Sequence, residues 1–359
     1  MYRKLILFLI LCSCVNIFGQ DSKPPNIIMM IGDGMGLSTI SSGMYSNNNY
    51  TALEGSEYVG LIKTHSLDDL VTDSAASATA MSSGVKTNNK VVGLDSKGNL
   101  VETILEMSID LGYSTAIVVT SSIVHATPAS YYAHIDNRYK YDEIADHLSK
   151  SKIDFFIGGG EKYFNNRSDK RNLISEMNQY FFAKNIDQYK KSNSNKIGFL
   201  TADDEPIEKY KNREPSLDKA VEITIQKLTD LKKPFFLLIE GSQIDWGSHD
   251  NSQKHMISEF IEFDKTIENV LDYAKKDKNT LVVITADHET GGVAIVDGSL
   301  ENSMVKNKYV SGSHTATMVP VFSFGKHSSL FKGIYDNTKI FDKLESIIKK
   351  WKKYYLLLL

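Results

Sequence analysis

Cysteine is nearly absent from this 359-residue sequence: Cys12 and Cys14 are its two cysteines, and both lie within the first nineteen residues. Residues 1–19 have the pattern of a secretory signal peptide, with Arg3 and Lys4 ahead of an apolar run and a small residue at the exit. Cleavage after this segment would leave a mature chain with neither a disulfide nor a thiolate. A metal ion would then need histidine, carboxylate or hydroxyl ligands.

Long hydrophobic segments are also scarce. The apolar run within residues 1–19 and the closing leucines 356–359 are both too short to span a bilayer. The residues before Cys14 loosely match a lipoprotein processing site, so acylation of Cys14 is the less favoured alternative to plain secretion. We predict an exported protein, periplasmic or extracellular, without a transmembrane segment.

The sequence has no excess of positive charge. Its net charge is −3, and loss of the two basic residues of the signal segment would make the mature chain more acidic. This charge gives no reason to expect a nucleic-acid partner. With 42% hydrophobic residues, the chain can bury a large core, which argues against disorder. We predict one domain over residues 20–359.

Seven apolar runs have the length and composition of buried strands, and amphipathic helical patterns lie between several of them. This alternation predicts an α/β fold, a three-layer α/β/α sandwich around a mostly parallel central sheet. A polar tract rich in lysine, asparagine and aspartate is predicted as a surface insertion, residues 161–213. The strand candidates are 26–31, 59–64, 114–120, 154–160, 234–240, 280–286 and 319–324, and the helical ones are 101–111, 141–150, 216–231, 252–275 and 337–350.

Ser74 lies between Asp73 and the small residues 75–78, which read as the start of a helix. Small neighbours leave room for a bulky group, and the unpaired N–H groups of a helix N-terminus suit a phosphate. A serine at this place is by default only an N-cap. Whether Ser74 is a nucleophile therefore depends on what the rest of the chain offers to ionise it.

Acidic and histidine residues follow the ends of the apolar runs. Asp33 comes just after the first run, Glu240 closes another, and Asp287 with His288 follows a third. In open α/β sheets, ligands bind outside the carboxyl ends of the strands. A lone aspartate after a strand is usually a turn or cap residue, but several such positions together predict one shared crevice.

Two further segments add candidate metal ligands. Asp245 and His249 are four residues apart, which places both on one face of a helical turn, although this spacing alone is mostly a surface pair. His314 lies on a late loop. Zinc accepts such nitrogen and oxygen ligands, and two zinc ions can ionise a nucleophile while stabilising a leaving oxygen.

Taken in order, six segments resemble the alkaline phosphatase family: IGDGMG, VTDSAASATA, HATPASYYAHIDNR, EGSQIDWGSH, ADHETGG and GSHTATMVPVF. The likeness runs over about residues 25–345 and is greatest with the compact secreted bacterial branch. It implies that the domain is a hydrolase, a metal-dependent phosphomonoesterase that acts at alkaline pH through a phosphoserine, with two Zn²⁺ and one Mg²⁺ per chain. Dimerisation is common in the family, so the resemblance also allows a homodimer.

The resemblance implies a role for each matching residue. Ser74 would be the nucleophile, and Arg138, oriented by Asp73, would grip two phosphate oxygens, a task that suits its planar fork. The implied metal ligands form three sets: Asp245, His249 and His314 for one zinc ion, Asp33, Asp287 and His288 for the other, and Asp33, Thr127 and Glu240 for magnesium.

His125 and Trp246 stand where other branches of the family place aspartate with lysine, or two histidines. His125 could hydrogen-bond a water on the third metal, and Trp246 is either an apolar wall that tunes the site or simply a packing residue. Two rival functions stay open: a phosphodiesterase or sulfatase of the same superfamily, and a catalytically silent binding protein on the same fold.

Overall fold

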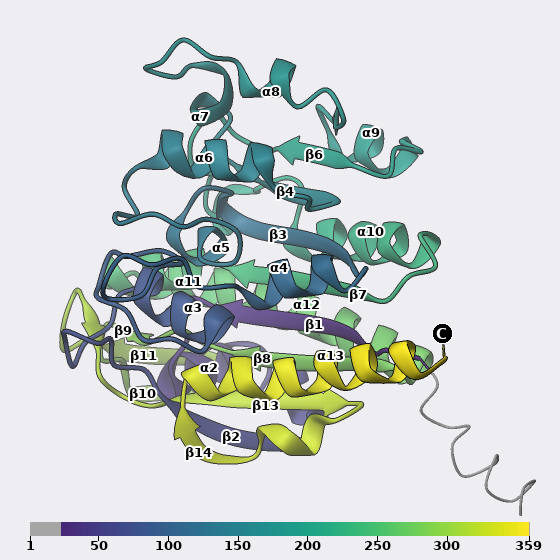
Figure 1. Cartoon of the computed structure of the whole chain (residues 1–359). Helices are drawn as coiled ribbons and strands as arrows, with labels where there is room; N and C mark the ends of the chain where they lie inside the picture. Colours follow the sequence, from purple (N-terminus) through teal and green to yellow (C-terminus); the bar gives the residue numbers. More distant parts are fainter. Residues whose placement is uncertain (1–22, 359) are drawn as a thin grey trace, which may run out of the picture.

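The computed structural model describes residues 23–358, and side chains up to residue 350. The predicted signal segment, with Cys12 and Cys14, lies outside the described residues. A ten-stranded sheet runs through the molecule in the order β14-β2-β13-β8-β1-β7-β3-β4-β6-β5 (Figure 1). One strand, β13 (Val319–Gly325), is antiparallel to its neighbours β8 (Thr280–Thr285) and β2 (Tyr58–Lys63), and the other pairs are parallel. The predicted mostly parallel sheet is confirmed.

The centre of the sheet is built from uninterrupted apolar runs. Strand β1 (Asn26–Gly32) lies between β7 (Phe235–Gly241) and β8, and β3 (Ser114–Ser122) pairs with the far side of β7. These strands are buried along almost their whole length. Strands without a polar alternation need cover on both faces, so the sheet requires a layer of helices on each side.

Helices supply that cover (Figure 1). The long α12 (Gln253–Asp277) and α10 (Leu217–Asp230) pack together on one face, and α4 (Ile104–Asp110) and α13 (Thr338–Leu358) lie on the other. Helix α4 begins with a capping box, in which Thr103 and Glu106 each accept a backbone N–H of the first turn. The three-layer α/β/α architecture is therefore confirmed, and α13 extends eight residues beyond the predicted 350.

Residues 161–213 add to one edge of the sheet. Strand β6 (Ile197–Leu200) pairs with β4 (Phe155–Gly159), and the two-residue β5 (Phe181–Phe182) pairs with β6. Phe164 and Tyr189 are fully buried beneath the polar surface of this segment. Its helices are short: α7 (Lys162–Asn165), α8 (Leu173–Glu176), α9 (Ile186–Lys191) and the 3₁₀ turn η2 (Lys209–Lys211).

Short elements at the carboxyl edge of the sheet carry the predicted site residues. They are α3 (Ser74–Ser83), α5 (Ala126–Ala129), α11 (Gln243–His249), β9 (Glu289–Thr290) and β12 (His314–Thr315). The remaining elements are α2 (Leu37–Ser46), η1 (Ala52–Gly55), α6 (Tyr141–Lys150), β10 (Ala294–Ser299), β11 (Met304–Lys308), η3 (Ser328–Phe331) and β14 (Gly333–Asp336). Within residues 23–358, no helix combines the length and the apolar character needed to cross a membrane.

Close contact between α11 and α12 positions two of the predicted ligands. A Cβ on Gly247 would lie 2.4 Å from the backbone nitrogen of Met256 and 2.7 Å from its Cα. Because backbone atoms cannot rotate away, Gly247→Ala should push α11 from α12 and lower the free energy of unfolding by about 1–3 kcal/mol. Metal content should fall with it, since α11 carries Asp245 and His249.

Urea unfolding and metal analysis of the purified variant would check this prediction. The matched control is Gly55→Ala, whose Cβ would meet only a Leu271 methyl, at 3.3 Å. Equal stability of the two variants would contradict the proposed backbone contact.

Candidate active site

Ser74 is the first residue of α3, and Asp73 rather than Ser74 caps this helix. The Asp73 carboxylate accepts the N–H of Ala76 at 2.9 Å, as expected of an N-cap. The Ser74 hydroxyl is therefore not used to cap the helix, and the serine is only 2% exposed. Its Oγ lies 3.2 Å from Nε2 of His288.

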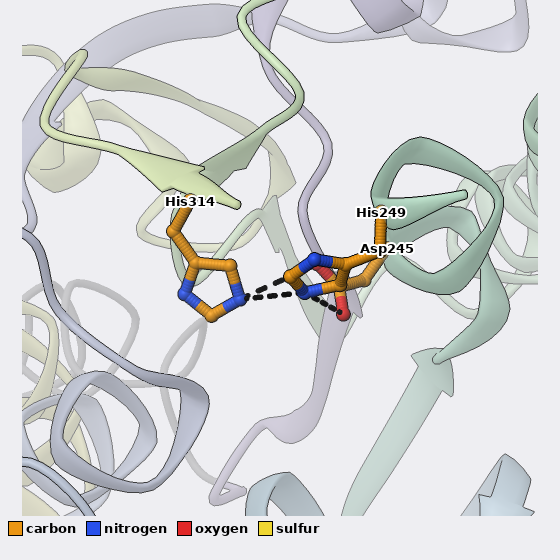
Figure 2. A group of neighbouring side chains, drawn as sticks. All are labelled: Asp245, His249 and His314. Carbon is orange, nitrogen blue, oxygen red and sulfur yellow. Dashed lines mark hydrogen bonds and ion pairs between the residues drawn. The ribbon is translucent and has the colours of Figure 1, made fainter. Parts of the chain in front are cut away.

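Asp245, His249 and His314 lie together, and one ligand atom of each is within 4.8 Å of the others. Figure 2 shows the two imidazole rings facing each other, with their Nε2 atoms 3.0 Å apart, and the Asp245 carboxylate beside His249. His249 Nε2 is 3.2 Å from Asp245 Oδ2. Residues from α11 and β12, far apart in sequence, thus form the first predicted ligand set.

Backbone carbonyls fix the orientation of these imidazole rings. Nδ1 of His249 donates to the carbonyl of Gly312 at 2.8 Å, and Nδ1 of His314 donates to that of Thr72, also at 2.8 Å. A carbonyl can only accept. When each ring is in its neutral form, its proton therefore sits on Nδ1, and Nε2 has a lone pair with which to bind a metal ion. Metal-binding histidines are held by partners of this kind.

His288 and three carboxylates form the second group, at the ends of β1 and β8 and on α11. One ligand atom each of Asp33, Asp245 and His288 lies within 4.8 Å of the others. Asp287 Oδ2 is 3.2 Å from His288 Nε2 and accepts no hydrogen bond within the described chain. The structure therefore brings the predicted set Asp33, Asp287 and His288 together, with Asp245 shared between the two groups.

A third group shares Asp33 with the second: Asp33, His125 and Glu240 each place one ligand atom within 4.8 Å of the others. Both carboxylate oxygens of Asp33 and of Glu240 are buried without a hydrogen-bond partner among the described residues, and so is the Thr127 hydroxyl. Such orphaned oxygens are rare in native proteins, and each needs a partner. An oxygen-rich set of this kind suits magnesium.

Electrostatics give a second sign that the site fits cations. Asp33, Glu240 and Asp287 are completely buried, and Asp245 is 4% exposed. Burial and the negative charge of Asp287 raise the pKa of Asp33 well above its ordinary value, and the same two causes raise the pKa of Glu240 to about 8. Buried carboxylates are tolerated when they are paired or bind metals, and divalent cations would supply the missing positive charge.

Arg138 faces Ser74 across the same pocket, a cavity of about 680 Å³. Its Nη1 donates to Asp73 Oδ2 at 3.0 Å, while its Nη2 lies 3.4 Å from His125. Trp246 stands edge-on to the His125 ring, with 5.8 Å between the centroids. Burial and the Arg138 charge lower the pKa of His125 to about 3, so this ring is neutral.

Some residues that hold the site were missed in the sequence. Thr290 donates to Asp245 Oδ1 and lies 3.1 Å from Nδ1 of His288, so one hydroxyl orients ligands of two groups. Asn89 accepts the N–H of Asp73 at 2.9 Å. The only available signal was position: Thr290 follows His288 by two residues, while nothing in the pattern around Asn89 pointed to the site.

The buried carboxylates predict how the metal-free protein responds to pH. Glu240 keeps its proton in the folded state up to about pH 8, against an ordinary pKa of 4.5, and the hydrogen bond that His249 donates to the Asp245 carboxylate raises the pKa of His249 to about 9. Between pH 7 and 9 the folded state therefore binds more protons than the unfolded state, so stability must fall as pH rises. We expect a loss on the order of 1 kcal/mol per pH unit after chelation.

Thermal unfolding of chelated protein across this pH range would test the expectation. Glu240→Gln should flatten the decline, because the amide has no proton to lose. A melting temperature that holds steady or rises toward pH 9 would show that the carboxylates are not protonated in the metal-free fold.

Comparison with known proteins places the chain in a family. The family model described as "Alkaline phosphatase" matches residues 24–309. Alkaline phosphatase 4 of Bacillus subtilis is 40% identical over 75% of this chain, although the match spans only 62% of that relative. Alkaline phosphatase 3 of the same organism is 32% identical over 90% of this chain and 88% of its own length.

Solved structures agree with the sequence comparisons. The alkaline phosphatase of the Antarctic bacterium TAB5 superposes with a TM-score of 0.86 at 40% identity, covering 91% of this chain and 98% of that one. A histidine-to-aspartate variant of that enzyme, with Mg bound in its M3 site, gives a TM-score of 0.85 at the same identity, over 91% of this chain and 99% of the other. The resemblance found in the sequence is confirmed.

Proposed function

This chain belongs to the alkaline phosphatase family, and from that premise we propose that it hydrolyses phosphate monoesters to an alcohol and inorganic phosphate through a phosphoserine at Ser74. The observation that carries this proposal is that three kinds of group meet at one pocket. They are a buried serine whose hydroxyl does not cap its helix, a buried arginine, and three groups of side chains that could bind metals. None of the predicted ligand positions holds an unsuitable residue, which disfavours a silent binding protein.

In the first step, Ser74 Oγ loses its proton and attacks the phosphorus. The bond from phosphorus to the alcohol oxygen breaks as the new bond forms, and the departing oxygen takes up a proton to leave as the alcohol. Arg138 binds two non-bridging oxygens of the phosphoryl group that is transferred, since its planar fork matches their spacing. Asp73 keeps the guanidinium in place through the 3.0 Å bond to Nη1. Positioning and fixed charge account for most of the acceleration in phosphoryl transfer.

In the second step, a water molecule attacks the phosphoserine from the side that the alcohol has left. The bond between phosphorus and Ser74 Oγ breaks, inorganic phosphate departs, and the serine regains its proton. Arg138 contacts the phosphoryl group in both steps, because Ser74 and Arg138 line the same pocket. The site is thus used twice with the same residues.

The family is metal-dependent, and the donor chemistry of each group suggests its ion. We assign zinc to the two groups that contain histidine nitrogen, centred on His249 with His314 and on His288, and magnesium to the oxygen-rich group of Asp33, Thr127 and Glu240. When bound, these cations supply Lewis acidity that lowers the pKa of a hydroxyl and stabilises a leaving oxygen. Export and a homodimer stay predictions, and both agree with the family assignment.

Phosphatase activity is the direct test. The protein supplied with zinc and magnesium should hydrolyse an aryl phosphate monoester far faster than the matching diester or sulfate, and chelation should abolish this turnover. Ser74→Ala should lower kcat by at least about 10³-fold, since removal of a nucleophile generally costs this much. Its metal content should stay close to that of the wild type.

Preference for the diester or the sulfate would reassign the substrate to another branch of the superfamily. Undiminished turnover by Ser74→Ala would show that the nucleophile is a different group. Acid quenching with radiolabelled substrate should trap phosphate on the wild-type chain and none on the variant.

His125 gives a prediction about the third metal. Its Nδ1 is buried without a hydrogen-bond partner in the described chain, and its neutral ring adds no charge to the group of Asp33 and Glu240. A carboxylate at this position would add an oxygen donor and a negative charge, which Mg²⁺ prefers. His125→Asp should therefore bind Mg²⁺ at least about tenfold more tightly, as adjacent-shell changes commonly alter metal affinity by 10–100-fold.

Magnesium titration followed by calorimetry would measure this change. Trp246→Phe is the control, because it keeps the aromatic neighbour of His125 and adds no ligand. Equal magnesium affinity in His125→Asp and wild type would show that the side chain at position 125 does not contribute to magnesium binding by the third group.

A further inference from the structure

Lys90 lies at the edge of the candidate active site and is one of ten non-glycine residues of the described chain with a positive φ. Its φ of +75° lies in the left-handed region, which is disfavoured for residues with a Cβ and which glycine adopts readily. Its N–H donates to Asp73 Oδ2 at 3.0 Å, and its carbonyl accepts the N–H of Arg138 at 2.8 Å. The strained residue therefore joins the two segments that position the phosphate-binding arginine.

Those backbone contacts do not require a lysine, since glycine would make both of them at lower conformational cost. Lys90 lines the pocket that also contains Ser74 and Arg138. Lys90 is exposed, and within residues 23–358 no carboxylate forms an ion pair with its ammonium group. A lysine with a strained backbone and an unpaired ammonium group, at the mouth of a catalytic pocket, indicates a binding site for a negatively charged group of a ligand.

The other charges of the pocket are already engaged. Asp73 binds Arg138 and two backbone N–H groups, and Asp245 belongs to the metal-binding groups. Asp69, at the same rim, accepts the N–H of Val71 at 3.0 Å. Arg138 and the metal groups together serve the phosphoryl group that is transferred, so the Lys90 ammonium remains for a second negative charge.

We propose that Lys90 is a specificity-determining residue that selects phosphate monoesters whose alcohol part carries a second anionic group, a carboxylate or another phosphate. This inference rests on the proposed function, because it concerns the substrates of the same site. An ammonium group on a flexible stem is a point charge that can follow an anion held at varying positions. It therefore favours a class of substrates rather than one compound.

The test compares pairs of substrates that differ in the second charge, with the metal-loaded enzyme. Suitable pairs are phenyl phosphate with 3-carboxyphenyl phosphate, and propyl phosphate with propane-1,3-diyl bisphosphate. In Lys90→Gln, which keeps the Cβ and a polar side chain but removes the charge, the ratio of kcat/KM for the charged over the uncharged ester should fall roughly two- to fivefold. High salt should reduce the wild-type ratio toward that of the variant.

Lys97→Gln is the matched control, since Lys97 is an exposed lysine of the same loop that does not line the pocket, and its ratio should equal that of the wild type. Lys90→Gly should lose the same selectivity while melting no lower than the wild type, which separates loss of charge from misfolding. An equal fall with both members of a pair, or an unchanged ratio, would overturn the inference and leave the phosphatase assignment intact. A wild-type enzyme inactive on all four esters would instead overturn the proposed function itself, and the inference with it.

Discussion

Burial of four carboxylates at one end of the sheet is the constraint on which this structure depends. Asp33, Glu240, Asp245 and Asp287 are withdrawn from water, and the oxygens of Asp33 and Glu240 have no hydrogen-bond partner among the described residues. A chain could not keep such a cluster for stability alone, because a desolvated charge without a counter-charge is costly. Divalent cations bound as proposed would stabilise the cluster, so the fold and its cofactors would form one thermodynamic unit.

The parallel sheet explains how these carboxylates meet. Asp33 and Glu240 lie at the ends of neighbouring strands, since β1 pairs with β7 in a register that sets Ile31 beside Glu240. Asp287 follows β8 on the other side of β1. Rigid, fully buried strands hold the deep ligands, while α11 and β12 bring the outer histidines from connecting segments. Ligands on strand ends are positioned more precisely than ligands on long loops.

Much of this could be predicted because the signals were strong. Each of the seven apolar runs became a strand, since a short continuous run rich in β-branched residues, such as 280–286, is typical of a strand buried on both faces. Strand β6 was not predicted because its four residues directly follow the polar run 191–196, and β14 was not predicted because only its pairing with β2 makes it a strand. Local preference does not decide such short edge elements.

The same distinction holds for the site. Side chains at strand ends could be assigned to one crevice, because parallel strands share a direction. The contacts of Thr290 and Lys90 depend on the conformations of the loops around that crevice. The hydrophobic periodicity of a sequence does not predict loop conformations. Ser74 shows the limit most clearly: a helix-start serine is ordinarily a cap, and only the structure shows that Asp73 performs this task instead.

The order of the ligands along the chain bears on biosynthesis. Asp33 lies near the beginning and His314 near the end, and β1 is completed only when β7 and β8, made some two hundred residues later, pair with both of its edges. No partial chain emerging from a ribosome can present all of the proposed ligands. With these ligand sets, metal loading would be a late event in the compartment where folding ends, and the metal supply of that compartment would decide which ions the newly made protein acquires.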